Sequence, residues 1–242
     1  MNKTILVCFV AVAVAVVTFL IVDNTHGLFV DEDVLAEGRE MGGFTQEMFD
    51  RFMLGEMKSA MASLAIWSAI LAAAAGFVLP SSGSRWMGLA AGIIVGALGG
   101  MVAGYLCSWH MGRFEFRSGA MVYWSARSAL TLAPIGAGVA MATAIGQKSA
   151  QALTDGLVSA LIGVVATSAV YVGLMGLVTP NEDHSLLFPT FSSNRAILIS
   201  LFSFVVLLMT HLSIAKSSAK ERKGANAETA QDLSESTEPA KT

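Results

Sequence analysis

Charged residues are scarce in this chain of 242 residues. Asp, Glu, Lys and Arg make up 14% of the sequence, whereas about a quarter is usual in soluble globular domains. Hydrophobic residues make up 54%, so the composition excludes an ordinary soluble domain and predicts a protein embedded in a lipid bilayer. The net charge of −3 is small, so we expect no binding to nucleic acid.

Cysteine is also rare, since Cys8 and Cys107 are the only two. Two cysteines give no disulfide framework. The topology derived below places them near opposite ends of two membrane spans, which is beyond the reach of a disulfide within one chain.

Sequence motifs of enzyme chemistry are missing. The chain has no Gly-x-Ser-x-Gly elbow, no phosphate-binding loop, no dinucleotide fingerprint and no HExxH spacing. Its apolar stretches carry no Asp, Glu or Lys away from their ends, so paired acids are not expected to meet inside the membrane. We therefore expect a protein that is not an enzyme and that has no metal and no cofactor.

Long hydrophobic runs dominate what is present. About 20 apolar residues in a helix cross a hydrocarbon core of about 30 Å. Six stretches meet this criterion and predict an all-α, polytopic membrane protein with about six transmembrane helices. They are Ile5–Val22, Ala60–Leu79, Met87–Leu106, Ser128–Ile145, Leu157–Val178 and Ala196–Ile214.

The segments divide the chain into four parts. Residues 1–22 read as an N-terminal anchor that is either an uncleaved span or a cleaved signal, and the residues after it favour the uncleaved span. Residues 23–59 form an acidic outer loop, in which the apolar spacing from Phe44 to Met61 predicts an amphipathic helix that lies on the surface or runs straight into the second span. Residues 60–214 carry the other five spans, and residues 215–242 are polar enough to predict a disordered tail.

Basic residues set the expected orientation in the cell membrane. Lys216, Lys220, Arg222 and Lys223 follow the last span closely, which marks that side as cytoplasmic. An even number of spans then places the N-terminus on the same side.

A glycine stands at every fourth position of the third span. Because glycine is a poor helix former, its repetition indicates close backbone approach between helices, and the stretch resembles the glycine-zipper segments of small bacterial membrane proteins. On a straight helix each fourth residue is displaced by about 40° from the last, so we expect one neighbour to meet only two or three of them. The second and fourth spans are then the neighbours of a central helix, and the first and last spans face lipid. The series is Gly88, Gly92, Gly96, Gly100 and Gly104.

Polar residues near the fourth span suggest a candidate solute path. Pro134 removes a backbone donor inside the span, and broken helices often mark transporter sites, although proline kinks in membrane helices also serve structure alone. Arg127 lies inside the membrane if its helix begins near Gly119, and extends to the outer interface if the membrane span begins at Ser128. Thr131 and Thr167 complete the path.

Three hypotheses for function follow. The first is a non-catalytic assembly or accessory component of a bacterial cytoplasmic membrane, whose partners are the lipid bilayer and membrane proteins, including copies of itself. The second is a channel or transporter for small solutes. The third is a membrane enzyme that uses the outer loops, with His110, Glu115 and His184 as its candidate residues. His26, His110 and His184 also map to the outer side, where imidazole groups could bind a metal, but their spacing matches no metal motif.

Overall fold

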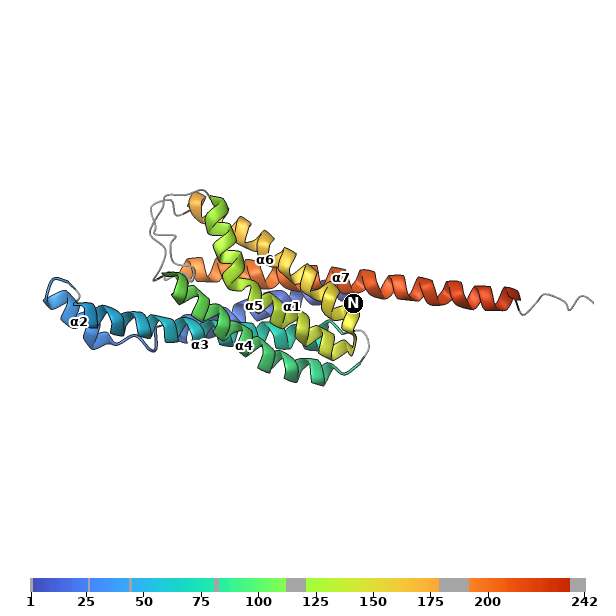
Figure 1. Ribbon diagram of the computed structural model, residues 1–242, viewed down its shortest axis with the longest axis horizontal. Helices are drawn as coiled ribbons and strands as arrows, with labels where there is room; N and C mark the ends of the chain where they lie inside the picture. Colours follow the sequence, from blue (N-terminus) through green and yellow to red (C-terminus); the bar gives the residue numbers. More distant parts are fainter. Residues whose placement is uncertain are drawn as a thin grey trace, which may run out of the picture.

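The computed structural model describes residues 2–25, 27–43, 45–80, 83–111, 121–178 and 192–235 (Figure 1). These residues form seven helices, and no strand occurs among them. All of the helices except α2 are long and apolar enough to cross a membrane, so the predicted fold class is confirmed. The helices are α1 (Lys3–Thr25), α2 (Glu32–Glu40), α3 (Gln46–Val78), α4 (Arg85–Met111), α5 (Met121–Gln147), α6 (Ala150–Val178) and α7 (Ser192–Glu235).

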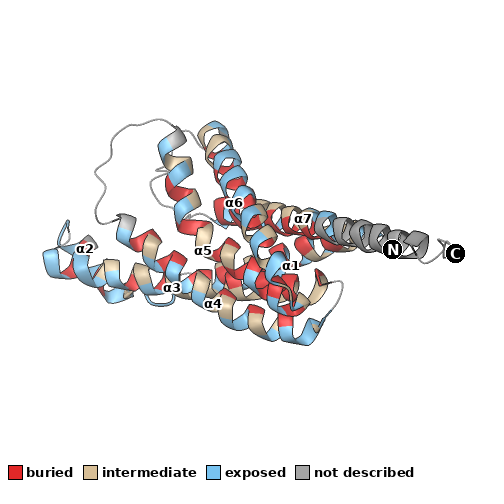
Figure 2. Ribbon diagram, turned by 45° about the vertical axis from the view of Figure 1, so that its right-hand side comes forward, coloured by how far each residue is buried: buried red, intermediate tan, exposed pale blue. Residues whose placement is uncertain are grey.

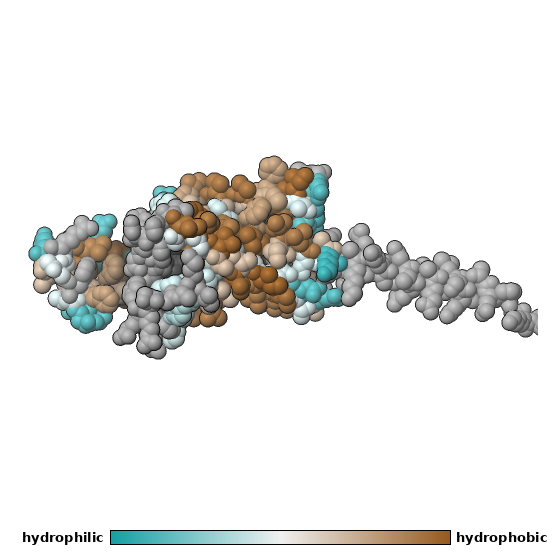
Figure 3. Space-filling view, turned by 90° about the horizontal axis from the view of Figure 1, so that it is seen from above, coloured by the Kyte–Doolittle hydropathy of each residue, from teal (hydrophilic) through white to brown (hydrophobic). Residues whose placement is uncertain are grey.

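The six long helices form one bundle with an apolar belt. On the face seen in Figure 3, hydrophobic residues cover its middle, and hydrophilic residues gather at both ends. We call the end that carries α2 the head end and the opposite end the tail end. The belt is the part of the bundle that fits the hydrocarbon core of a bilayer.

The long helix α3 extends beyond the belt at the head end. It has 33 residues, about 50 Å at 1.5 Å per residue, whereas a span needs about 20 residues. Its first turn is capped by Thr45, whose side chain accepts a hydrogen bond from the Met48 amide at 3.3 Å. The amphipathic helix expected over Phe44–Met61 thus runs straight into the second span.

The short helix α2 is attached to this extension, and we call α2 together with residues 46–58 the head. The Phe29 amide, in the turn before α2, donates a hydrogen bond to Ser59 Oγ at 3.3 Å. Arg51 and Asp31 form an ion pair at 2.6 Å. A Cβ atom added to Gly55 would lie 2.6 Å from the Phe29 carbonyl oxygen, so this glycine allows the turn to lie directly on α3.

The distribution of burial differs from the expected one. The expectation that the first and last spans lie at the periphery is wrong for α7, because half of its spanning window is buried, whereas α4 and α6 are the least buried spans at 28% each (Figure 2). The glycine-rich α4, third of the six spans in chain order, contacts α3 and α5 and leaves its other side exposed. The helix α7 is more buried than expected because its large apolar side chains fill the core. They include Leu198, Ile199, Phe202, Val206 and Leu207.

The last helix is also longer than expected. Residues 215–242 were predicted to form a disordered tail, but α7 continues as one helix to Glu235. The sequence from 216 to 235 is rich in Ala, Lys and Glu, which have high helix propensity even without an apolar stripe. The residues from 236 onwards lie outside the described part of the chain.

Side chains at the tail end fasten α1 to its neighbours. Lys3 Nζ donates a hydrogen bond to the Leu79 carbonyl oxygen at 2.9 Å. His211 Nε2 and Thr4 Oγ1 are hydrogen-bonded at 3.2 Å. His211 is 5% exposed and lies where α7 packs against α1.

Candidate functional site

The glycine series of α4 lies along α3. A Cβ atom added to Gly92 would lie 2.5 Å from the Ala72 carbonyl oxygen, and one added to Gly96 would lie 2.5 Å from the Ser68 carbonyl oxygen. Gly88 and Gly100 face the carbonyl groups of Gly76 and Leu64 in the same way, and Gly104 faces the backbone nitrogen and Cα atom of Met61. The two backbones are therefore in direct contact along the whole series.

One neighbour thus meets all five glycines, and the expectation that it meets only two or three is wrong. The 40° drift of the row does not carry it away from α3, because two helices that cross at an angle follow an inclined row of residues. The fourth span contributes as well, since α5 approaches Gly88 through Gly146 and Gly96 through Gly138. Both expected neighbours contact the series, but α3 alone covers its full length.

The residues of the candidate solute path lie on α5 and α6. Thr131 and Thr167 are each 1% exposed. Pro134 lies inside α5, and its carbonyl oxygen would be 2.6 Å from a Cβ atom on Gly99 of α4. The proline thus lies at a close contact between α5 and α4.

Arg127 is a buried cation on α5. Because α5 begins at Met121, Arg127 lies within this helix, six residues after its start. The side chain is 6% exposed, and its guanidinium carbon lies 5.4 Å from the centroid of the Trp124 ring. Cation–π contacts of this kind contribute up to about 2 kcal/mol when they are desolvated.

Two kinds of buried hydroxyl group bear on the candidate path. In one kind the hydroxyl donates to the carbonyl oxygen of the preceding turn, as Thr143 does to Val139 at 2.8 Å and Thr210 does to Val206 at 2.8 Å. In the other kind the hydroxyl has no hydrogen-bond partner among the described residues. This second kind comprises Thr18, Ser63, Ser68, Thr131, Thr167 and Ser168.

Two polar contacts between distant parts of the chain were not predicted. Trp67 is fully buried, its Nε1 donates to Ser203 Oγ at 3.1 Å, and its ring meets Phe202 edge-on at 5.1 Å. Arg195 is 5% exposed and pairs with Asp23 at 2.6 Å. The only signal in the sequence was the position of Asp23 and Arg195 at the borders of the first and last spans.

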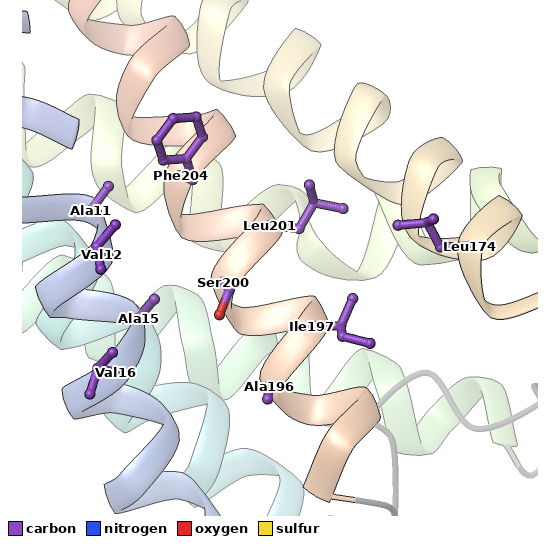
Figure 4. A pocket seen from close by; sticks show the side chains of 10 residues that line it. All are labelled: Ala11, Val12, Ala15, Val16, Leu174, Ala196, Ile197, Ser200, Leu201 and Phe204. Atoms are coloured by element: carbon purple, nitrogen blue, oxygen red, sulfur yellow. The ribbon is translucent and has the colours of Figure 1, made fainter. Parts of the chain in front are cut away.

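Two apolar grooves open on the bundle surface. One, of about 560 Å³, lies between α1 and α7 with Leu174 of α6 at its edge (Figure 4). Its small residues are Ala11, Ala15, Ala196 and Ser200. A second, of about 850 Å³, lies between α5 and α6 and is lined by Ala129, Ala133 and Val165 among others. Neither groove is lined by acids, bases or thiols, so their linings offer contact with apolar partners rather than chemistry.

The outer-loop hypothesis falls on residues that the structure does not describe. His26, Glu115 and His184 lie outside the described residues, and so does the side chain of His110. Within the described part of the chain, no three His, Cys, Asp or Glu side chains gather in a group fit for a metal ion.

Comparisons with protein-family models, curated proteins and solved structures found no match. The fold defines the class: an all-α protein with six helices that suit a multi-pass membrane protein. Its role is argued from its own residues below.

Proposed function

We propose that the protein is a non-catalytic assembly or accessory component of a bacterial cytoplasmic membrane, and that it binds a partner protein through its head. The observation that carries this proposal is a head that combines exposed apolar side chains with an excess of acidic residues. Between residues 31 and 58 the chain has eight acidic residues and three basic ones.

Large apolar side chains of the head and its adjoining turn are open to solvent. Phe29 is 53% exposed, Met41 61%, Phe49 47% and Leu54 47%. Such groups at the end of a bundle favour a protein contact. About 13 residues of α3 exceed the length that a span needs, so Phe49 and Leu54 stand away from the hydrocarbon core.

The chemistry of the head defines the partner. Acidic residues around exposed aromatic and aliphatic groups complement a segment that carries Lys or Arg beside apolar side chains. A second copy of this head is a poor partner, because two acidic heads repel each other.

Site-specific photo-crosslinking in cells tests the proposal. A photoreactive residue at Phe49 should give a discrete adduct with another protein, whereas the same residue at Ile94, on the exposed side of α4, should give none. Glu37→Lys together with Glu47→Lys should reduce the Phe49 adduct at least about fivefold, since like charges then meet across the contact. Lys216→Glu, a charge reversal at the tail end, should leave the adduct unchanged.

Two results would overturn this proposal. One is an adduct between two copies of this chain only. The other is an adduct whose yield is the same with and without the two head charge reversals.

A solute path is the second candidate function. The observation that favours it is the set of buried hydroxyl groups without hydrogen-bond partners among the described residues, which includes the two path residues Thr131 and Thr167.

A further inference from the structure

Four buried hydroxyl groups on α3, α5 and α6 have no hydrogen-bond partner among the described residues, namely those of Ser63, Thr131, Thr167 and Ser168. Thr143, on the same helix as Thr131, donates to the carbonyl of its preceding turn at 2.8 Å, as serine and threonine commonly do in helices. Thr131 and Thr167 do not, although each is 1% exposed. A buried hydroxyl without a partner costs about 1–3 kcal/mol, so a bound water that pairs with several of them would stabilise the fold.

The contacts between α5 and α6 place two of these groups at one depth. Gly136 of α5 lies against Val164 of α6, where an added Cβ atom would be 2.8 Å from a Val164 methyl group. The helices run in opposite directions, so Thr131 and Thr167 both lie towards the head end from this contact. They are five and three residues away from it, which corresponds to about 7 and 5 Å along the axis. Ser168 follows Thr167 directly.

The contacts of α4 with α5 and with α3 place Ser63 of α3 at nearly the same depth in the bundle as Thr131. Gly99 of α4 meets the Pro134 carbonyl of α5, and the adjacent Gly100 meets the Leu64 carbonyl of α3. Ser63 precedes Leu64, and Thr131 precedes Pro134 by three residues. Ser63 is fully buried and has no hydrogen-bond partner in the described part of the chain. Three helices therefore direct unpaired hydroxyl groups into the protein within about one helical turn of depth.

The charged side chain of Arg127 lies next to these hydroxyl groups, on their head-end side. Arg127 precedes Thr131 by four residues and so lies on the same face of α5, one turn nearer the head end. It is 6% exposed. Charged residues within membrane-spanning helices usually face the bundle interior or a water-filled cavity.

We propose that Ser63, Thr131, Thr167 and Ser168 line a hydrated site inside the head-end half of the bundle, where bound water molecules hydrogen-bond their hydroxyl groups. Buried water forms about three hydrogen bonds on average with groups that would otherwise be unpaired. The inference is independent of partner binding by the head. It supplies the polar interior that a solute path would require.

Thiol reactivity tests for water at this site, because a thiol must ionise in water to react. Single Thr131→Cys and Thr167→Cys variants, with Cys8→Ser and Cys107→Ala removing the native thiols, are treated in detergent micelles with a small charged methanethiosulfonate. Each should react at least about tenfold faster than Thr143→Cys, which is equally buried but replaces a hydroxyl that is already paired. Rates equal to that of Thr143→Cys would overturn the proposal.

A second measurement does not depend on introduced thiols. Thr131→Val with Thr167→Val removes two hydroxyl groups and keeps the side-chain shape. If water is bound, the pair should lower the midpoint of thermal unfolding by about 2–4 °C or more, while Thr143→Val should change it by less. A raised midpoint would show that the site is dry, since deleting an unpaired buried hydroxyl then stabilises the fold.

Discussion

The glycines of α4 allow close helix packing because they have no side chains. Without side chains, the backbone of α4 reaches the carbonyl oxygens of α3 at Ser68 and Ala72, where dispersion and Cα–H···O contacts accumulate along the row. A helix in lipid gains no hydrophobic energy by leaving lipid for protein, so such close contact is a main source of its association.

Replacing one of these glycines with alanine should therefore destabilise the protein. A Cβ atom on Gly100 would overlap the Leu64 carbonyl and lie 2.6 Å from Ala65 Cα, and backbone atoms cannot move aside as a side chain does. We expect Gly100→Ala to cost about 1–3 kcal/mol, measured by denaturant titration in mixed micelles.

The matched control is Gly173→Ala on α6. Nothing lies within 4 Å of a Cβ atom there, so this change should gain up to about 1 kcal/mol from helix propensity. Equal effects of the two substitutions would contradict the packing account.

The sequence predicted the glycine row but not its partner, and the reason is geometric. A period of four residues is visible in one helix, whereas the crossing angle that lets α3 follow all five glycines depends on both helices. Contacts between remote residues were equally hidden. Trp67 and Ser203 are 136 residues apart, and neither residue alone indicates the other.

At the scale of elements, the position of the head on α3 depends mainly on the close contact at Gly55. The turn at Phe29 and Val30 lies against Gly55 on α3, while the Arg51–Asp31 ion pair is exposed and such pairs add little stability. The position of α2 therefore rests mainly on the glycine and on the Ser59 hydrogen bond.

Gly55→Leu should release the turn from α3 without unfolding the bundle. A side chain there meets backbone atoms of residues 29 and 30, so we expect at least about fivefold faster limited proteolysis between residues 27 and 45. Gly43→Ala, where an added Cβ atom meets nothing within 4 Å, should leave the rate unchanged. Unaltered proteolysis in Gly55→Leu would show that other contacts hold the head.

Hydropathy located the six spans but not the ends of their helices. A bilayer sets where apolar residues stop, whereas a helix stops only at a cap or a breaker. This is why α3 begins before its span at Gln46 and α7 continues after its span to Glu235.

At the scale of the whole molecule, six spans place the start of α1 and the tail of α7 at one end. The hydrogen bond between Thr4 and His211 joins these two helices there, while the head stands at the other end (Figure 1). Basic residues after the last span favour a cytoplasmic tail end, so we expect the head on the outer side of the membrane.

Labelling of single cysteines from each side of the membrane tests this account most directly. In a background without Cys8 and Cys107, Glu37→Cys reports the head and Ala219→Cys reports the tail. An impermeant thiol reagent should label Glu37→Cys in intact cells, and Ala219→Cys only in inverted membrane vesicles. Labelling of both cysteines from the same side would contradict the six-span bundle and, with it, the placement of the head.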